Sequence, residues 1–309
     1  MDLSSISPAL VVASLMVAST PLLLAALGEL VVEKAGVLNL GVEGMMITGA
    51  ICGFAIAVET GSPPLGFLAA MAGGAALSMV FAVLTLVLLA NQVATGLALT
   101  LFGLGLSSML GQGYVGIKPP ATARLDLGPL SDLPFLGRAV FSHDWMVYVS
   151  LGLTVAIWYV LTRTRAGLTL RAVGENHDAA HALGLKVVAI RFAAIGFGGA
   201  MAGLGGAYLS LVRVPQWTEG MTAGAGWIAL AIVVFASWRA DRVLLGAYLF
   251  GGVTVLQLNL QAAGSALPVE YLSMSPYVIT ILVLVIMSAR RSRATAAPAS
   301  LGKPFHATA

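Results

Sequence analysis

Long apolar runs separated by short polar segments make up most of the sequence. A helix that crosses a bilayer needs about 20 apolar residues. By that measure nine spans are predicted, at residues 8–27, 42–58, 65–89, 93–112, 145–161, 192–211, 224–238, 243–262 and 274–289. The pattern predicts an all-α, polytopic membrane helix bundle of about 8 to 10 transmembrane helices. These helices form a single transmembrane domain over residues 1–290.

The composition agrees with this class. Of the 309 residues, 59% are hydrophobic and 9% are charged, whereas an average soluble domain has about 25% charged residues. The net charge is +3, and the basic residues are spread over short loops. This distribution is typical of residues that orient a protein in the membrane and does not indicate nucleic-acid binding. The only cysteine, Cys52, lies in an apolar run, so an internal disulfide and a cysteine metal site are excluded.

The basic residues predict how the chain is oriented. With nine spans the N-terminus lies outside and the segment 163–191 inside, and the positive-inside rule places most Lys and Arg inside. A half-span near Glu43-Gly44-Met45 or Glu219-Gly220-Met221 would change the predicted side of the N-terminus and leave the rest of the orientation as it is. Four basic residues fall outside: Lys118, Arg124, Arg138 and Arg213. Twelve fall inside: Lys34, Arg163, Arg165, Arg171, Lys186, Arg191, Arg239, Arg242, Arg290, Arg291, Arg293 and Lys303.

Three other segments carry predictions of their own. The proline-containing segment 113–144 is expected to be an ordered external loop. Residues 291–309, rich in Ala, Pro and Ser after an arginine cluster, are expected to be a disordered cytoplasmic tail held near anionic lipid. Gly199 and Gly203 lie four apart and are expected to let helices pack closely.

The polar segment 163–191 is rich in Arg and Lys and is expected to lie in water. Its middle predicts a short helix over residues 177–183. Asn176 is a suitable N-cap, Asp178 lies in the first turn where the helix dipole favours a carboxylate, and Gly184 can end the helix in the left-handed conformation. So short a helix needs a partner to stabilise it.

An ordinary basic loop would contain the same residue types, but the spacing Asp178-Ala179-Ala180, three residues, Gly184 resembles a known motif. In permeases of ABC importers, Glu-Ala-Ala followed three residues later by Gly forms a cytoplasmic helix that docks into the ATPase subunit. Here Asp replaces Glu, and the usual downstream Leu-Pro is absent. The resemblance assigns coupling to the ATPase to Arg171, Gly174, Glu175, Asn176, Asp178, Ala179, Ala180 and Gly184.

A second polar stretch, residues 27–46, interrupts the apolar pattern. Ionisable groups at membrane depth cost about 2.5–3.5 kcal/mol and normally face water or a partner. Glu33 and Lys34 are expected at the surface of a cytoplasmic turn, and Glu29 is expected to cap or pair locally. Asn39 and Glu43, at i and i+4, would share a helix face and either line or support a translocation pathway.

The clearest resemblance lies in the same stretch. Gly36-Val-Leu-Asn-Leu-Gly-Val-Glu-Gly-Met-Met46, Asn91-Gln-Val-Ala-Thr-Gly-Leu-Ala-Leu-Thr100, Leu170-Arg-Ala-Val-Gly-Glu-Asn176 and Gly206-Ala-Tyr208 resemble nucleoside-type ABC-importer permeases. That branch belongs to a superfamily with ribose and branched-chain amino-acid permeases. Ribose-type permeases have Ile-Asp-Leu-Ser where this chain has residues 37–41, which argues against the ribose branch. The matches run from about residue 20 to 290.

The resemblance implies a multi-pass permease subunit in the bacterial cytoplasmic (inner) membrane, surrounded by lipid. Members of that branch pair with a second, non-identical permease and with an ATPase subunit that has two nucleotide-binding domains. They receive nucleoside from an extracytoplasmic substrate-binding protein. The sequence contains no Gly-x-x-x-x-Gly-Lys-Ser/Thr phosphate loop, so ATP is expected on the partner. We expect no cofactor and no nucleic acid bound by this chain.

Polar and aromatic side chains in or near the predicted spans are candidates for the translocation pathway. Amides offer a donor and an acceptor to a base or a ribose hydroxyl, but they also bond between helices at about 0.6 kcal/mol. Tryptophans near the outer mouth either anchor at the interface or stack on a purine. The candidates are Asn39, Glu43, Asn91, Gln92, Thr95, Trp217, Trp227, Gln257 and Asn259.

Other functions have weaker support. An ion-coupled secondary transporter would use Glu43 or Glu29 as a proton carrier, and a protonophore would then abolish uptake even with ATP present. An enzyme would need a catalytic arrangement such as Ser-His-Asp or paired carboxylates, and the sequence suggests none. His177 and His181 have metal-binding spacing but lack a third strong ligand nearby. Glu43-Gly44-Met45 and Glu219-Gly220-Met221 are either a chance echo or an internal repeat.

Overall fold

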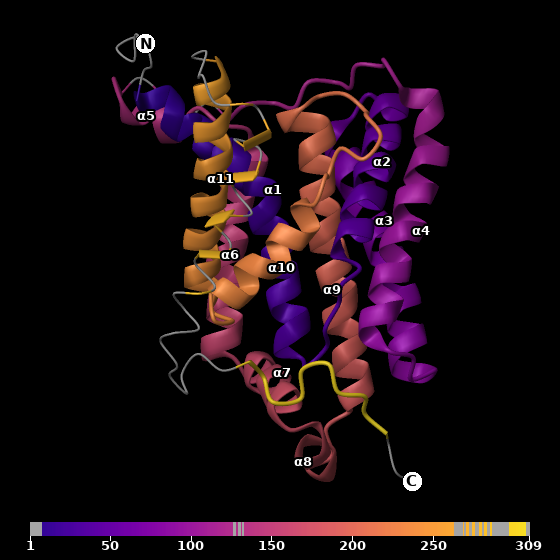
Figure 1. Ribbon diagram of the computed structural model, residues 1–309. Coiled ribbons are helices and arrows are strands. Elements are labelled where there is room, and N and C mark those ends of the chain that lie inside the picture. Colours follow the sequence, from indigo (N-terminus) through magenta and orange to yellow (C-terminus); the bar gives the residue numbers. More distant parts are fainter. Residues whose placement is uncertain are drawn as a thin grey trace.

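A computed structural model describes residues 8–125, 128, 131, 133–262, 268, 270, 271, 274, 275, 278, 279, 281, 282, 285 and 297–306. Figure 1 shows long helices packed side by side along one common direction. Within the described part, seven helical stretches are long and apolar enough to cross a membrane. They are Pro8–Lys34 (α1), Val42–Thr60 (α2), Pro63–Val87 (α3 with a terminal π-turn), Gln92–Tyr114 (α4 with a 3-10 turn), Trp145–Arg163 (α6), Val187–Arg213 (α9 with a π-turn) and Ala240–Ala262 (α11).

These stretches confirm seven of the nine predicted spans. The predicted span 224–238 is wrong as a full crossing, because the helix there, Ala225–Phe235 (α10), has only 11 residues. At about 1.5 Å per residue it covers roughly half of a bilayer core. The predicted span 274–289 lies largely outside the described residues.

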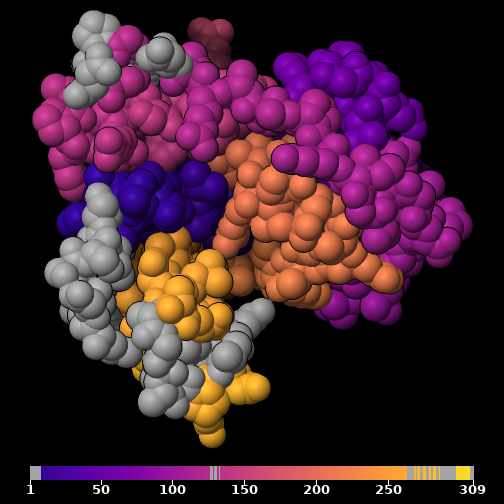
Figure 2. All heavy atoms as spheres, turned by 90° about the horizontal axis from the view of Figure 1, so that it is seen from above, coloured from indigo at the N-terminus to yellow at the C-terminus, as the bar shows by residue number. Residues whose placement is uncertain are grey.

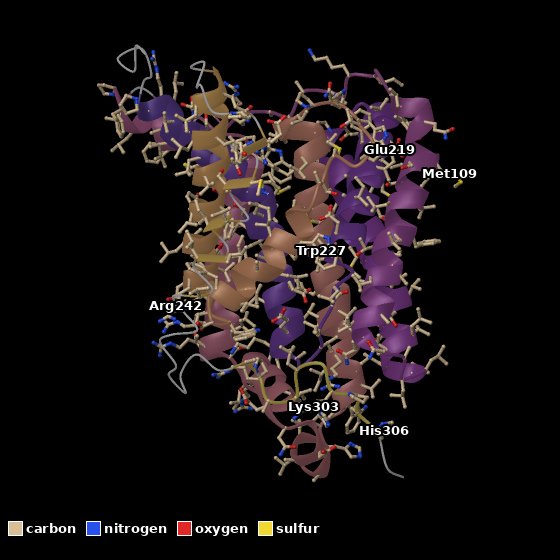
Figure 3. The ribbon with its side chains drawn as sticks, viewed as in Figure 1. Met109, Glu219, Trp227, Arg242, Lys303 and His306 are labelled. Atoms are coloured by element: carbon tan, nitrogen blue, oxygen red, sulfur yellow. The ribbon has the colours of Figure 1, made fainter. Side chains whose placement is uncertain are left out.

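Short helices occupy the two ends of the bundle. Arg165–Glu175 (α7) and His177–Ala182 (α8) lie at one end, and Leu136–Val140 (α5) lies at the other (Figure 1). The α7–α8 end also carries Lys303, whereas Glu219 lies near the opposite end (Figure 3). We call the α7–α8 end the basic end, because α6 ends there at Arg163, α7 begins there at Arg165, Lys186 precedes α9 there, and Lys303 lies there as well. The predicted orientation puts this end in the cytoplasm.

Two helices begin in the interior of the bundle. After α1 reaches the basic end, residues 35–41 return without regular helix, and α2 begins at Val42. Residues 214–224 likewise lead without a continuous helix from the opposite end to the start of α10 (Figure 1). Seen from that opposite end, α9 and the segment after it fill the middle of the molecule (Figure 2).

Glycines bring the central helices into backbone contact, as the Gly199 and Gly203 spacing predicts. A Cβ atom added to Gly203 would lie 2.1 Å from the carbonyl oxygen of Ala70 on α3. A Cβ atom on Gly199 would lie 2.3 Å from Oγ of Ser78. Only residues without a side chain allow this approach, which is the main packing device between helices in lipid. α9 is therefore the centre of the core, packed against α1, α2 and α3.

Candidate functional site

The predicted short helix near residue 180 is confirmed. The Oδ1 atom of Asn176 accepts a hydrogen bond from the Ala179 N–H at 3.0 Å, so Asn176 is the N-cap of α8. Gly184 has φ +83° and donates its N–H to the carbonyl of His181 at 2.8 Å. The preceding α7, which ends at Glu175, was not predicted. Thr164 is its N-cap and accepts a hydrogen bond from the Gly167 N–H at 3.2 Å. Threonine is a favoured N-cap residue, so the sequence did contain a signal for the start of this helix.

The two faces of α8 differ. His177 and Ala180 are buried against the rest of the chain, whereas Asp178, Ala179 and the following Leu183 are exposed. Leu183 has 82% of its surface accessible. Leu183 and the small side chains beside it thus form an exposed apolar tip at the end of α8.

The other coupling candidates divide in the same way. Glu175 and Asn176 are exposed, and Arg171 is half-buried with Nε donating to the carbonyl of Gly167 at 3.4 Å. Gly174 is buried, and a Cβ atom there would lie 2.1 Å from the carbonyl oxygen of Lys34. The structure thus places Gly174 and Ala180 inside the protein, where they connect the α7–α8 unit to the transmembrane helices.

Residues 297–306 do not form the disordered tail that their composition predicts. They lie along the basic end beside α7, α8 and the adjoining end of α9 (Figure 1). The Ser300 N–H donates to the carbonyl of Gly174 at 2.9 Å. Phe305 is 6% exposed and packs with Val173, Ala180 and Val187. The expectation for residues 291–296 and 307–309 lies outside the described residues.

The histidine pair of α8 faces this C-terminal segment. The rings of His177 and His181 have their centres 5.3 and 5.4 Å from that of Phe305, both edge-to-face. The Nδ1 atom of His177 lies 3.2 Å from a guanidinium nitrogen of Arg191, which is fully buried. A guanidinium only donates, so His177 accepts at Nδ1 and is neutral in this arrangement.

This arrangement predicts a pH dependence. Burial, and then the charge of Arg191, lower the pKa of His177, while Asp178 opposes this shift and Lys303 adds to it. A lowered pKa in the folded state means that the contribution of His177 to stability is present above its unfolded pKa of about 6.5 and is lost as pH falls through the folded value.

We therefore expect hydrogen exchange of residues 297–306, corrected for intrinsic rates, to be faster at acidic pH than at neutral pH. His177→Gln keeps an acceptor but cannot be protonated, so it should remove this dependence, whereas the exposed His181→Gln should keep it. Equal pH responses in the wild type and His177→Gln would contradict the assignment.

A second group of polar residues lies where α2 and α10 begin. The Glu43 carboxylate accepts from the N–H groups of Gly224 at 3.1 Å and Gly226 at 2.7 Å, and from the hydroxyl of Thr222. A Cβ atom on Gly226 would lie 2.5 Å from the Glu43 nitrogen, so the two helix starts touch. A carboxylate at a helix N-terminus is favoured by the helix dipole and by the free N–H groups. Glu43 therefore holds the start of α10.

Its neighbours are also engaged inside the protein. The Asn39 side chain accepts from the Gly41 N–H at 2.9 Å, and its backbone N–H donates to Glu29 at 3.3 Å. The surface position predicted for Glu33 is wrong. Its side chain is buried because α1 continues to Lys34, and it accepts a hydrogen bond from the indole of Trp238. Lys34, also expected at the surface, is only partly exposed.

The two Glu-Gly-Met segments lie close together in the structure. The first copy supplies Glu43, and the segment that directly follows the second copy supplies its hydrogen-bond donors. Glu219 itself is exposed and accepts from the Ser108 hydroxyl at 2.5 Å. The two segments therefore meet in the bundle, while the two glutamates have different roles. That they descend from an internal repeat stays a prediction.

The remaining pathway candidates on α4 lie in different surroundings. Gln92 is buried and accepts from the Leu38 N–H at 2.8 Å, which places it beside the segment before α2. Thr95 is buried on the same helix. Asn91 is exposed and caps α4 through the Ala94 N–H at 3.0 Å. The structure thus brings Gln92 close to the segment that carries Asn39.

The aromatic candidates and those on α11 lie elsewhere. Trp227 sits near the middle of the bundle, so its expected place at the outer mouth is wrong (Figure 3). Trp217 is 2% exposed and packs against Gly111, so it is a core residue rather than an interfacial anchor. Gln257 and Asn259 are half-buried, and Asn259 donates to the Val255 carbonyl of its own helix at 2.8 Å.

Sequence reasoning missed several residues that build these sites. Arg191 had an available signal, because it is a charged residue next to an apolar run. Thr222, Gly224 and Gly226 follow the second Glu-Gly-Met tripeptide but were not predicted as partners of Glu43, since backbone N–H donors such as those of the two glycines have no sequence signature. Phe305 was overlooked because its neighbours have the composition of a disordered segment.

Residues 11–287 match the family of permease components of branched-chain amino acid transport systems. The chain belongs to this family. The match covers the transmembrane helices described above, apart from the first three residues of α1, and ends before the C-terminal segment 297–306.

Similar proteins are named as ABC transporter permeases for sugars or nucleosides. The chain is 46% identical over 254 aligned positions to the putative glucose ABC transporter permease protein TsgC13 of Haloferax volcanii, covering 81% of this chain and 77% of that protein. It is 32% identical over 323 positions to the guanosine ABC transporter permease protein NupQ of Bacillus subtilis, covering 99% and 98%. The nucleoside ABC transporter permease protein NupC of Lactococcus lactis is 32% identical over 291 positions, covering 90% and 92%. The chain is thus a permease subunit of an ABC importer.

The two guanosine permease proteins of Bacillus subtilis resemble the chain unequally. NupQ is 32% identical along almost the whole chain, whereas NupP is 25% identical over 277 positions, covering 87% of this chain and 78% of NupP. The chain corresponds to NupQ more closely than to NupP.

Proposed function

We propose that this permease imports nucleosides as one of two non-identical permease subunits in a bacterial cytoplasmic membrane. The observation that carries the proposal is the end-to-end match to NupQ, which spans 99% of this chain and 98% of that guanosine permease. The match thus runs along nearly the full length of both proteins. It agrees with the resemblance of residues 36–46 to nucleoside-type permeases.

Glucose or a related monosaccharide is the second candidate, favoured by the 46% identity to TsgC13. The two solute classes share the hydroxyl groups of a sugar ring. Hydroxyl groups both donate and accept, so amide side chains such as those of Asn39 and Gln92 could bind either class. A transport assay with both solutes separates the two.

The proposal includes three partners. Bacillus subtilis has two guanosine permease proteins, and the chain matches one of them better, which supports pairing with a second, different permease. An ABC ATPase subunit would bind the exposed tip of α8. An extracytoplasmic binding protein would deliver the solute at the end opposite the basic end.

The contacts within the chain suggest how ATPase movement reaches the pathway. A displacement of α8 is passed through α7 to α1, because Gly174 lies directly against Lys34. α1 continues into residues 35–41, which lead to α2 and Glu43. Glu43 in turn holds the start of α10. Interrupted helices whose N-termini meet inside a bundle are a common site of solute binding in transporters.

The proposal is tested by uptake into proteoliposomes that contain this chain, the second permease and the ATPase, with the binding protein added. We expect ATP-dependent uptake of labelled guanosine that is unaffected by a protonophore. Uptake of glucose with no uptake of guanosine would contradict nucleoside import and support the second candidate solute, a monosaccharide. Uptake that needs no ATP and is abolished by the protonophore would refute the ABC mechanism.

A prediction about α8 follows from its exposed tip. Leu183→Ala should weaken ATPase binding by roughly ten- to a hundredfold, because burying a leucine in a partner contributes about 1.5–3 kcal/mol. Thermal stability of the isolated chain should not change, since Leu183 is 82% exposed. The control is Leu168→Ala on α7, where the leucine is 61% exposed. ATPase affinity is measured by titration in detergent; equal affinities of the two variants would contradict docking at α8.

A further inference from the structure

Residues 297–306, which we call the C-terminal strap, bind the joint between α7 and α8. Besides the bond to Gly174, the Ser300 hydroxyl lies 3.3 Å from the carbonyl of Glu175 and accepts from the N–H of His177 at 3.4 Å. Ser300 is 5% exposed. A single strap residue thus contacts the last turn of α7 and the first residue of α8.

The same strap contacts the transmembrane helices. The Gly302 N–H donates to the carbonyl of Gly36, just after α1, at 3.3 Å. The carbonyl of Lys303 accepts from Arg191 on α9 at 3.3 Å. Arg191 also donates through Nε to the carbonyl of Ala35 at 3.1 Å. Its guanidinium therefore joins the strap, α9 and the end of α1 at one buried point.

Phe305 completes the connection to α8. Its ring contacts both histidines of α8 and packs with Ala180, which faces inward from the same helix. The groove beside it, lined by His181, Leu185, Val188 and Phe192, has a volume of about 680 Å³. Phe305 forms part of the wall of this groove.

The inward face of α8 is small. The helix has six residues, and only His177 and Ala180 are buried. Both of these residues contact or pack with Phe305, and His177 is also held by Arg191. A helix of fewer than two turns has little stability of its own and depends on such tertiary contacts. Much of the connection between α8 and the membrane helices therefore runs through the strap.

We propose that the C-terminal strap is a positioning element that makes α8 move together with α1 and α9, so that ATPase movement reaches the transmembrane pathway. The proposal rests on the proposed function, since it concerns coupling between the ATPase and transport. It adds a role for residues beyond position 287, where the family match ends. The exposed face of α8 remains free for the ATPase.

The first experiment compares a chain truncated after residue 296 with a control truncated after residue 306, each in the full importer complex. The control keeps every strap residue. Without the strap, the ATPase should still co-purify and hydrolyse ATP. The number of solute molecules imported per ATP hydrolysed should fall by at least about fivefold, within the range of ordinary coupling energies. Hydrogen exchange of α8 should become faster by a similar factor.

Point substitutions keep the test valid if the truncated chain folds poorly. Phe305→Ala should lower the import-to-hydrolysis ratio in the same direction, Phe305→Leu should restore most of it, and His306→Ala at the exposed neighbouring position should have no effect. A ratio and α8 exchange unchanged by Phe305→Ala would overturn the proposal. Loss of ATPase co-purification in the truncated chain would also overturn it, because the strap would then be part of the docking surface. Failure of the proposed function would instead appear in the full-length chain as absence of ATP-dependent uptake.

Discussion

Glu43→Ala is expected to abolish ATP-driven uptake and to lower the free energy of unfolding by at least about 3 kcal/mol. The carboxylate accepts from two backbone N–H groups and one hydroxyl at the start of α10. Hydrogen bonds to a charged group contribute about 1.5–3 kcal/mol each, and donors left unpaired in a buried site add to the loss. Residues 222–226 would lose their anchor on α2, and α10 would lose its fixed position in the pathway.

The sequence offers a matched control for this substitution. Glu219 belongs to the same Glu-Gly-Met tripeptide but is exposed. Glu219→Ala should therefore change stability by no more than about 0.5 kcal/mol. Melting in detergent and uptake in proteoliposomes measure the two effects. A Glu43→Ala protein that melts like Glu219→Ala and transports normally would contradict the anchoring role.

A third variant separates anchoring from proton transport. Glu43→Gln keeps the volume and one acceptor oxygen, so it should retain part of the uptake if Glu43 acts as an anchor. A proton carrier cannot be replaced by an amide, so an ion-coupled transporter would lose all uptake with Glu43→Gln. The comparison of Ala and Gln at this position thus distinguishes the importer from the rival mechanism.

The length of the apolar runs predicted most of the helices, but it did not predict that α10 begins inside the bundle rather than at one of its ends. Apart from Ser237, the run 224–238 contains no polar side chain except the indole of its tryptophans. Yet α10 starts only after Gly224, with φ +87°, and ends before Ser237 and Trp238, which have φ +51° and +56°. Hydropathy measures whether residues tolerate a nonpolar environment. Hydropathy therefore cannot distinguish a helix from a non-helical segment at membrane depth. A non-helical backbone is tolerated there when protein rather than lipid surrounds it.

Contacts between distant segments were beyond sequence reasoning for a different reason. Asn176 could be assigned as a cap because its partner, Ala179, is three residues away. The donors to Glu43 lie about 180 positions further along the chain. Ser300 bonds to residues more than 120 positions before it. No local pattern encodes such a pairing, and the neighbours of Ser300 have the composition of a disordered tail.

Gly206→Ala is expected to lower the yield of folded protein and its melting temperature, although alanine favours helix by about 1 kcal/mol over glycine. A Cβ atom at Gly206 would lie 1.9 Å from the carbonyl oxygen of Met46 and 3.0 Å from the Ala50 nitrogen. Both contacts are backbone atoms of α2, so a side-chain rotation cannot relieve the overlap. α2 and α9 must separate, and overpacking of this kind costs about 1–3 kcal/mol.

The control is Gly152→Ala on α6, where an added Cβ atom meets no atom within 4 Å. That variant gains helix propensity without a clash, so it should melt at or above the wild-type temperature. Size-exclusion yield and a melting curve in detergent compare the two. Because α2 carries Glu43, a shift of α2 away from α9 should also disturb the anchor of α10. Uptake by Gly206→Ala should therefore fall by a larger factor than the amount of folded protein does. Equal melting of Gly206→Ala and Gly152→Ala would contradict the close approach of α2 and α9.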